Sequence, residues 1–409
     1  MTSPGWVGAL GVTFTMQLAI SFLSSAVTVS APMLTAAAGV PIERIGYFSA
    51  LSTVASMWYM MSCGPLLGQF GPLRLLQVGL ALASTSMLVV IVGEWLALLA
   101  AALVFGLGYG PVPAASSDIL ARRTPAPRRG LAFSIKQAGV PVGQALGGLV
   151  VPALALAFGW RAALAGACAA CLVLVIAAQP LRAGFDDARS GLGFRGLAWG
   201  RILTPANLAQ PWRTISAVPD MAWVTYAGFC LACAQGSLFS FYVAYLTADL
   251  GFALTAAGTA YAVLQGMGAV GRVLAGWLAD RTSATATLML LGASSCTALV
   301  LTASLATLAP WGAVLAVAAF AGLAAVSWNG VYLAEVARTA PAGKVGDTTS
   351  ASSFFTFIGY AAGPAAFSAL VEATGRYDLV FLIFAALPAS AIPALLRARR
   401  RAAARAPAC

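Results

Sequence analysis

Long apolar stretches, separated by short polar turns, run through almost the whole chain. Residues 75–92 contain no charged side chain, and neither do residues 282–334. A helix needs about 20 apolar residues to cross the hydrocarbon core of a bilayer. Apolar length and turn signals therefore predict twelve crossing helices, at residues 7–31, 45–67, 73–92, 95–120, 131–157, 161–181, 219–247, 253–278, 285–307, 311–335, 348–371 and 377–397.

These stretches are apolar on every side, which predicts helices rather than the strands of a membrane β-barrel. Barrel strands alternate apolar and polar residues over segments of roughly ten residues. Here 60% of the residues are hydrophobic and only 9% are charged, against roughly 25% charged in soluble domains. We therefore expect an all-α membrane protein.

One long polar interruption divides the chain. It lies at residues 182–218 and leaves six predicted crossings on each side. The expected organisation is a six-helix bundle at 1–181, a cytoplasmic linker at 182–218, a second bundle at 219–398 and a basic cytoplasmic tail at 399–409.

The formal net charge is +11, and the basic residues are placed asymmetrically. With both termini in the cytoplasm, the outside loops hold only Arg44, Arg161 and Arg376, whereas 19 of the 23 Lys and Arg residues lie at or near cytoplasmic segments. An excess of Lys and Arg on the cytoplasmic side is the rule for membrane proteins. We therefore predict a multi-pass protein of the bacterial inner membrane, embedded in the lipid bilayer and without a nucleic-acid partner.

Several kinds of chemistry have no residues to support them. The chain has no histidine, which excludes imidazole catalysis and metal ligation by histidine. Two Cys-x-x-Cys pairs, 168–171 and 230–233, lie inside apolar runs, where cysteine acts as a small apolar residue. We expect no enzyme activity, no metal and no cofactor. The first apolar segment is long enough to span the membrane, so we expect it to remain rather than be cleaved as a signal peptide.

Weak repetition links the two halves. Residues 64–69 correspond to 276–281 at an offset of 212. Asp118 and Glu335 close helices four and ten at an offset of 217, and the glycine-rich segments of helices five and eleven are offset by 220. Repeated bundles are typical of secondary transporters, whose solute site lies near the membrane midplane at the interface of the repeats.

The segment Gly271–Arg281, Gly-Arg-Val-Leu-Ala-Gly-Trp-Leu-Ala-Asp-Arg, resembles the loop motif between helices 8 and 9 of the major facilitator superfamily. Residues 139–148 resemble the Gly-Pro motif of helix 5 that is associated with antiporters. The first-half loop departs from the pattern, because Gly68 and Gln69 stand where Asp and Arg are usual. The resemblance covers the whole chain. It implies the major facilitator fold, with twelve helices in two pseudo-symmetric bundles and transport by alternating access.

Two local resemblances concern the solute. Residues 134–141 resemble bacterial members of a cyanate-transporter-like group. Arg272 is similar to a helix-8 arginine that holds carboxylate in monocarboxylate and oxalate/formate transporters. Both resemblances imply an anion carrier.

Polar side chains gathered on one face of a membrane helix mark a solute path, because lipid offers them no partner. Besides the cations below, the predicted substrate-binding residues are Gln17, Ser21, Tyr226, Gln235, Tyr261, Gln265, Trp328, Asn329 and Tyr332. Small hydroxyl residues also pack helices together, so packing stays open as the role of any single serine.

Two cations lie inside predicted crossings, where a charge costs roughly 2.5–3.5 kcal/mol on insertion scales. They are Lys136 in helix five and Arg272 in helix eight, and no acidic residue lies equally deep. The resemblance implies that helices five and eight border one cavity. Our hypothesis is that both cations bind an anionic group of the solute. The alternatives are that Lys136 extends to the interface and that Arg272 pairs with Glu335 or Asp280 at a cytoplasmic gate.

A further set of residues is expected to serve the mechanics of transport. Glycines and prolines should let helix five approach helix eight, and helix two approach helix eleven. These helix-packing residues are Gly139, Pro141, Gly143, Gly147, Gly359, Gly363 and Pro364. The gating residues, expected to form a cytoplasmic charge network, are Asp118, Arg122, Asp280, Arg281, Glu335 and Arg338.

The sequence thus predicts a secondary transporter that moves a small organic anion, similar to a monocarboxylate, by alternating access. Energy is expected from a proton or solute gradient, with protons as the expected coupling ion, since no nucleotide-binding Gly-x-x-x-x-Gly-Lys-Ser/Thr loop is present. A monomer is the expected state, as is usual in carriers of this kind. The alternative is a proton-coupled exporter of drugs or amphipathic metabolites, which the helix-five motif and several aromatic residues favour. No deep carboxylate is available to carry its proton.

Overall fold

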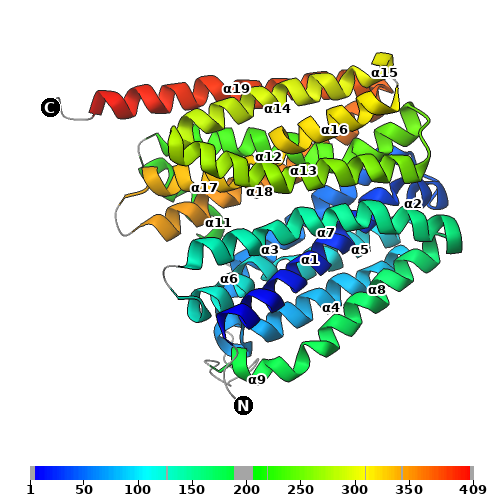
Figure 1. Ribbon diagram of the computed structural model, residues 1–409, viewed down its shortest axis with the longest axis horizontal. Coiled ribbons are helices and arrows are strands. Elements are labelled where there is room, and N and C mark those ends of the chain that lie inside the picture. The colour runs from blue at the N-terminus through cyan, green and yellow to red at the C-terminus, as the bar shows by residue number, and fades with distance from the viewer. Residues whose placement is uncertain are drawn as a thin grey trace. The chain divides into compact units, whose positions relative to one another are not determined.

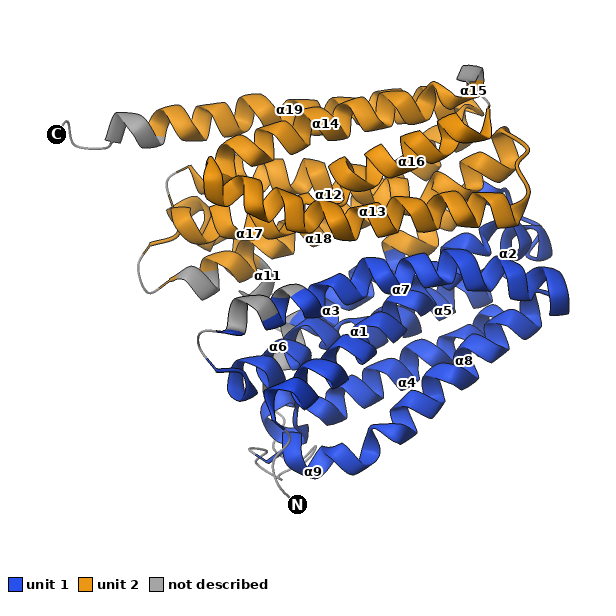
Figure 2. Cartoon of the chain, viewed as in Figure 1, with its two compact units in different colours: residues 1–42, 51–204 blue, residues 43–50, 205–409 orange. Residues whose placement is uncertain are grey.

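A computed structural model of the chain describes residues 5–125, 128–187, 206–218, 220–308, 310–341 and 344–405. Within these ranges all regular structure is helical (Figure 1). Contacts divide the chain into two compact units, drawn in different colours in Figure 2. Unit 1 consists of residues 1–42 and 51–204, and unit 2 of residues 43–50 and 205–409.

The first unit is built from long apolar helices joined by tight turns at glycines. Its helices are α1 (Trp6–Val29), α2 (Ala31–Ala37), most of α3 (Ile45–Phe70), α4 (Pro72–Val90), α5 (Trp95–Tyr109), α6 (Pro111–Arg123), α7 (Arg129–Phe158), α8 (Trp160–Ala177) and α9 (Arg182–Phe185). Gly71 and Gly159 have positive φ angles of 88° and 83°, which glycine adopts without steric cost, and each turns the chain directly into the next helix.

The second unit repeats this plan and begins with a short additional helix. Its helices are α11 (Ala206–Ala217), α12 (Met221–Ala244), α13 (Leu254–Arg281), α14 (Ala284–Ala303), α15 (Leu305–Leu308), α16 (Trp311–Ala325), α17 (Trp328–Thr339), α18 (Val345–Thr374) and α19 (Tyr377–Arg405). The start of α3 belongs to this unit, where the Ser240 hydroxyl donates to Ser49 at 2.9 Å.

The helices confirm the predicted all-α membrane fold. Eleven spans in the described part of the chain are long and apolar enough to cross a bilayer. The remaining predicted crossing, residues 45–67, is occupied by α3, which is 26 residues long. Part of the predicted linker and tail, residues 188–205 and 406–409, lies outside the described residues, as do the side chain of Cys63 and all of Cys409.

Two predicted crossings are each broken into two helices. Residues 95–120 contain the α5–α6 break at Gly110, where Pro111 begins α6 without a backbone N–H to donate. Residues 311–335 contain the α16–α17 break at Val326 and Ser327, without a proline. The two breaks lie in the fourth crossing of each half. Discontinuous helices at corresponding positions are typical of the solute sites of secondary transporters.

Glycines bring helix backbones together inside unit 1. A Cβ atom at Gly139 would lie 3.2 Å from the Phe14 carbonyl oxygen of α1. A Cβ atom at Gly143 would overlap the Leu18 carbonyl, and one at Gly147 would overlap the Ser25 hydroxyl. The glycine face of α7 therefore packs directly on α1.

The equivalent contact in unit 2 joins α18 to α12. A Cβ atom at Gly359 would lie 2.6 Å from the Phe229 carbonyl oxygen, and one at Gly363 would lie 2.5 Å from the Cys233 carbonyl oxygen. The closest partners of these glycines thus belong to the first long helix of their own unit. The expected approach of helix two to helix eleven is seen within unit 2, where a Cβ atom at Gly46 of α3 would lie 2.5 Å from the Pro364 carbonyl oxygen of α18. The approach of helix five to helix eight stays a prediction. Pro141 and Pro364 lie inside α7 and α18.

Replacement of Gly143 by valine tests this packing. Gly143→Val should lower the melting temperature of the purified protein by several degrees, because overpacking typically costs about 1–3 kcal/mol. The matched control is Gly166→Val in α8, where a Cβ atom meets nothing within 4 Å. Equal melting temperatures for the two variants would contradict the close approach of α7 and α1.

Candidate functional site

A cluster of hydrogen bonds in unit 2 centres on the side-chain oxygen of Gln235. This residue of α12 is only 1% exposed. Its Oε1 atom accepts from Trp328 Nε1 at 2.9 Å, from Asn329 Nδ2 at 3.2 Å and from the Tyr360 hydroxyl at 2.6 Å. A carbonyl oxygen has two lone pairs, so three donors saturate it. The cluster joins α12, α17 and α18 through one buried amide.

Aromatic rings form one wall of the Gln235 cluster. The Trp328 and Tyr360 rings stack with centroids 6.4 Å apart, and Trp328 meets Tyr332 edge-on at 5.5 Å. Sequence reasoning did not select Tyr360. Tyr360 directly follows Gly359, in a helix where only glycines and a proline were predicted to have a role. A tyrosine next to a glycine that packs two helices together could have indicated it.

The α16–α17 break positions Arg272 close to this cluster. Arg272 Nε donates to the Val326 carbonyl oxygen at 3.2 Å, a carbonyl at the end of α16. The preceding residue must be small, because a Cβ atom at Gly271 would lie 2.9 Å from the Leu323 carbonyl oxygen and overlap the Ser327 hydroxyl. Val326 precedes Trp328 by two residues, so this bond holds the Arg272 guanidinium near the start of α17.

Tyr261 and Gln265 lie one turn apart on α13. The Tyr261 ring meets the Phe239 ring of α12 edge-on at 6.4 Å. Gln265 is fully buried, and among the described residues neither its Nε2 nor its Oε1 atom has a hydrogen-bond partner. The structure therefore joins Gln235, Trp328 and Asn329 in one hydrogen-bonded cluster, and it places Tyr261, Gln265 and Arg272 along one face of α13.

Two of the predicted binding residues lie away from the Gln235 amide. Tyr226 is nine residues from Gln235, two and a half helical turns, and so lies on the opposite face of α12. It is 42% exposed, and its hydroxyl lies 2.9 Å from that of Ser390 in α19. The Tyr332 hydroxyl bonds to that of Ser352, which lies 3.0 Å from that of Thr225, so Tyr332 ties α17 to α18 and α12.

In unit 1 the predicted polar residues lie along the contact between α1 and α7. Gln17 Nε2 donates to the Ser21 hydroxyl at 3.4 Å, and both side chains are buried. Ser21 packs beside Gly143. Lys136 precedes Gly139 by three residues, which places it on the same face of α7, and it is only 3% exposed. It takes part in none of the ion pairs formed by the described residues.

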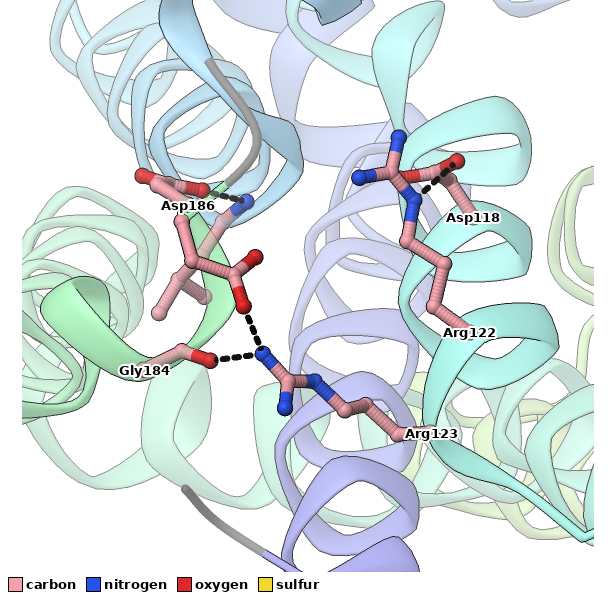
Figure 3. A network of polar contacts seen from close by, with 7 residues as sticks. Asp118, Arg122, Arg123, Gly184 and Asp186 are labelled. Carbon is pink, nitrogen blue, oxygen red and sulfur yellow. Dashed lines mark hydrogen bonds and ion pairs between the residues drawn. The ribbon is translucent and has the colours of Figure 1, made fainter. Parts of the chain in front are cut away.

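The expected gating residues of unit 1 form local contacts (Figure 3). Arg122 pairs with Asp118 of its own helix, with Nε 3.0 Å from a carboxylate oxygen. The neighbouring Arg123, which sequence reasoning did not select, reaches across to the Gly184 carbonyl oxygen and the Asp187 carboxylate. Arg123 thus joins the end of α6 to the segment that follows α8.

Asp186 is a second residue that sequence reasoning missed, and it holds the start of α4. Its carboxylate accepts from the backbone N–H groups of Leu73 at 2.8 Å and Arg74 at 3.2 Å, and it pairs with Arg182 at 3.3 Å. Burial raises the pKa of Asp186, while the bonds from Leu73, Arg182 and Arg74 act in the opposite direction. The first-half loop lacks the usual Asp–Arg pair at 68–69, and Asp186 supplies a carboxylate to this region from elsewhere in the sequence.

Unit 2 joins two of the four residues expected in its charge network. Arg338 donates to both carboxylate oxygens of Glu335, at 3.0 and 2.6 Å, and the Thr285 hydroxyl of α14 donates to the same carboxylate at 2.9 Å. Arg281 lies over the Trp277 ring of its own helix at 4.1 Å. Asp280 takes part in no ion pair of the described residues.

The fold and these buried polar side chains define a polytopic helical membrane protein of the transporter class. The sequence model described as Major Facilitator Superfamily matches residues 13–364. The chain therefore belongs to the major facilitator superfamily, whose members are transporters and not enzymes.

Comparisons with individual proteins agree with this family. Two similar proteins, from Mycobacterium tuberculosis strains CDC 1551 and H37Rv, are both described as uncharacterised MFS-type transporters. They are 26% and 25% identical to the chain over 388 residues, which is 94% of this chain and 82% of theirs.

Solved structures share the fold at low sequence identity. The nucleoside transporter NupG has a TM-score of 0.77 at 13% identity, covering 95% of this chain and 99% of its own. A bacterial homologue of the human lysosomal transporter Spinster scores 0.75 at 13% identity, covering 98% of both chains. The peptide transporter POT scores 0.71 at 13% identity, covering 97% of both chains.

Removal of the Asp186 carboxylate tests its capping role. Asp186→Ala should destabilise the protein by about 0.5–2 kcal/mol, the usual cost of losing a helix cap. Asp186→Asn should be destabilised less, because its amide oxygen can still accept a hydrogen bond from the backbone of α4. Thermal unfolding of the purified variants measures the order. The control is Asp187→Ala, which breaks a pair whose carboxylate is 56% exposed and should cost about 0–1 kcal/mol. A larger loss for Asp187→Ala than for Asp186→Ala would contradict the cap.

Proposed function

We propose that this transporter carries a small organic anion, similar to a monocarboxylate, across the bacterial inner membrane by alternating access, with both termini in the cytoplasm. The observation that carries the proposal is Lys136, a buried lysine within an apolar span that takes part in no ion pair of the described residues.

A buried charge needs an opposite charge or hydrogen bonds to compensate for its desolvation, which costs on the order of several kcal/mol. Lys136 would gain that compensation from an anionic solute. The alternative of extension to the interface requires a water-accessible amine, and a residue that is 3% exposed has little accessible surface. Anion binding therefore explains the buried lysine better.

Arg272 supplies the second cation of the proposed binding residues. Its Nε bond to Val326 holds the guanidinium at the end of α16, and Val326 precedes Trp328 of the Gln235 cluster by two residues. Guanidinium groups bind carboxylates through paired, charge-assisted hydrogen bonds. A carboxylate is therefore the anionic group that suits this arginine, and this supports a monocarboxylate-like solute.

An ion gradient supplies the energy in this proposal, and proton symport is its expected form. The solved structures of similar fold are named for different solutes, nucleosides and peptides among them, so the substrate class rests on Lys136 and Arg272. The Trp328–Tyr360 stack would also suit an amphipathic solute, which keeps proton-coupled export of drugs or amphipathic metabolites as the second candidate.

Ligand-induced thermal shifts test the anion proposal. The purified protein should be stabilised by at least one member of a panel of carboxylates and cyanate. Lys136→Gln and Arg272→Gln should each weaken this binding at least about tenfold, since a hydrogen bond to a charged group contributes about 1.5–3 kcal/mol. Lys136→Gln should remain folded, because neutralising its buried charge removes a desolvation cost.

The controls use exposed cations of the same type. Lys344, the only other lysine of the chain, and Arg399 are both exposed, so Lys344→Gln and Arg399→Gln should bind like the unmodified protein. Stabilisation by cationic dyes alone would overturn the anion proposal and favour the exporter.

A further inference from the structure

Gln265, one of the predicted substrate-binding residues, is a buried amide in unit 2 for which no ligand group has been assigned. Its exposed fraction is 0%, and neither its amide nitrogen nor its amide oxygen has a hydrogen-bond partner within the described part of the chain. Unpartnered buried polar groups are rare in proteins because they lose their bonds to water without replacement. Such a group therefore calls for a partner that the described residues do not supply.

The position of Gln265 on α13 directs it away from lipid. The exposed side of this helix carries Val270, Val273, Leu274 and Trp277. At 3.6 residues per turn, Gln265 lies on the opposite half of the helix, on one stripe with Tyr261 and Arg272. Tyr261 contacts Phe239 of α12, and Arg272 bonds to Val326 at the α16–α17 break.

Two contacts of α13 with its neighbouring helices place the Gln265 amide at the height of the Gln235 cluster. Phe239 of α12 lies opposite Tyr261 of α13, and the two helices are consecutive and antiparallel. Gln235 lies four residues before Phe239 on α12, and Gln265 lies four residues after Tyr261 on α13. Because the helices are antiparallel, Gln235 and Gln265 lie at a similar height along them. A Cβ atom at Gly268, one turn beyond Gln265, would lie 2.5 Å from Val326, so the helix break is also near.

We propose that Gln265 binds a carboxamide-type group of the solute, one that presents an adjacent N–H and C=O. A glutamine amide offers one acceptor and two donors in a single plane. A primary carboxamide or a lactam satisfies both of its ends with two parallel hydrogen bonds, whereas a carboxylate satisfies only the donor end. The proposal rests on the proposed function for the anionic part of the solute and assigns the uncharged polar part to Gln265.

Pairs of nearly isosteric anions test this assignment by thermal shift. Oxamate differs from pyruvate, and malonamate from acetoacetate, mainly by an amide NH₂ in place of a methyl group. The amide member of each pair should stabilise the protein at roughly tenfold lower concentration. Gln265→Met, which keeps the side-chain length, should abolish this preference while binding of the ketone member persists. Lys136→Gln should weaken both members alike.

The melting temperature without ligand provides a readout that needs no solute. Because Gln265→Met removes two unpartnered buried polar atoms, it should raise the melting temperature by a few degrees. Gln77 is the matched control, since its Nε2 donates to the Val175 carbonyl oxygen at 3.0 Å and to Gln179 Oε1 at 3.1 Å. Gln77→Met should therefore lower the melting temperature.

The outcomes separate this proposal from the anion proposal. A fall in melting temperature for Gln265→Met, like that of Gln77→Met, would overturn the inference, as would an unchanged preference for oxamate over pyruvate in that variant. If no anion binds the unmodified protein but neutral lactamide does so through Gln265, the anion proposal fails and the role of Gln265 stands.

Discussion

Hydrocarbon lipid offers no hydrogen bonds, and this constraint governs which residues the chain can place inside its helices. Backbone groups satisfy one another within each helix, and polar side chains need partners from other helices or from a solute. Most buried polar residues of the described chain meet this demand within their own unit. Gln235 takes three donors from α17 and α18, and Glu335 takes bonds from Arg338 and Thr285. Lys136 and Gln265 are among the buried exceptions, and the proposed solute binding depends on these two.

The same constraint explains why glycine and helix breaks accompany the polar residues. Gly143 lets the backbone of α7 approach that of α1, and Gly363 lets the backbone of α18 approach that of α12. Side chains beside each of these contacts are therefore held at short range. The α16–α17 break then presents a carbonyl oxygen at Val326, which the Arg272 guanidinium binds. Packing, backbone geometry and the placement of a cation are thus coupled at one point of unit 2.

Apolar length and loop charge were enough to predict the fold class, because both follow directly from the thickness and electrostatics of a membrane. They located α12, α13 and α18 to within a few residues. They did not predict the break at Val326, which has no proline and depends on the approach of Gly271. Nor did they reveal Asp186, whose role as a cap depends on contact with α4, more than a hundred residues away in sequence. Polar stripes indicated the Gln235 cluster but could not separate Tyr226, which bonds to α19, from the residues beside it.

Transport by the purified protein in proteoliposomes tests the central claim, that a buried cation of α7 serves an anionic solute. Uptake of radiolabelled monocarboxylates, compared between protein-containing and empty liposomes under an inward proton gradient, is the direct measurement. The unmodified protein should take up at least one carboxylate, Lys136→Gln should lose this uptake, and Lys344→Gln should be unaffected. Carboxylate uptake that persists at the unmodified rate in Lys136→Gln, or transport of cationic compounds alone, would contradict it.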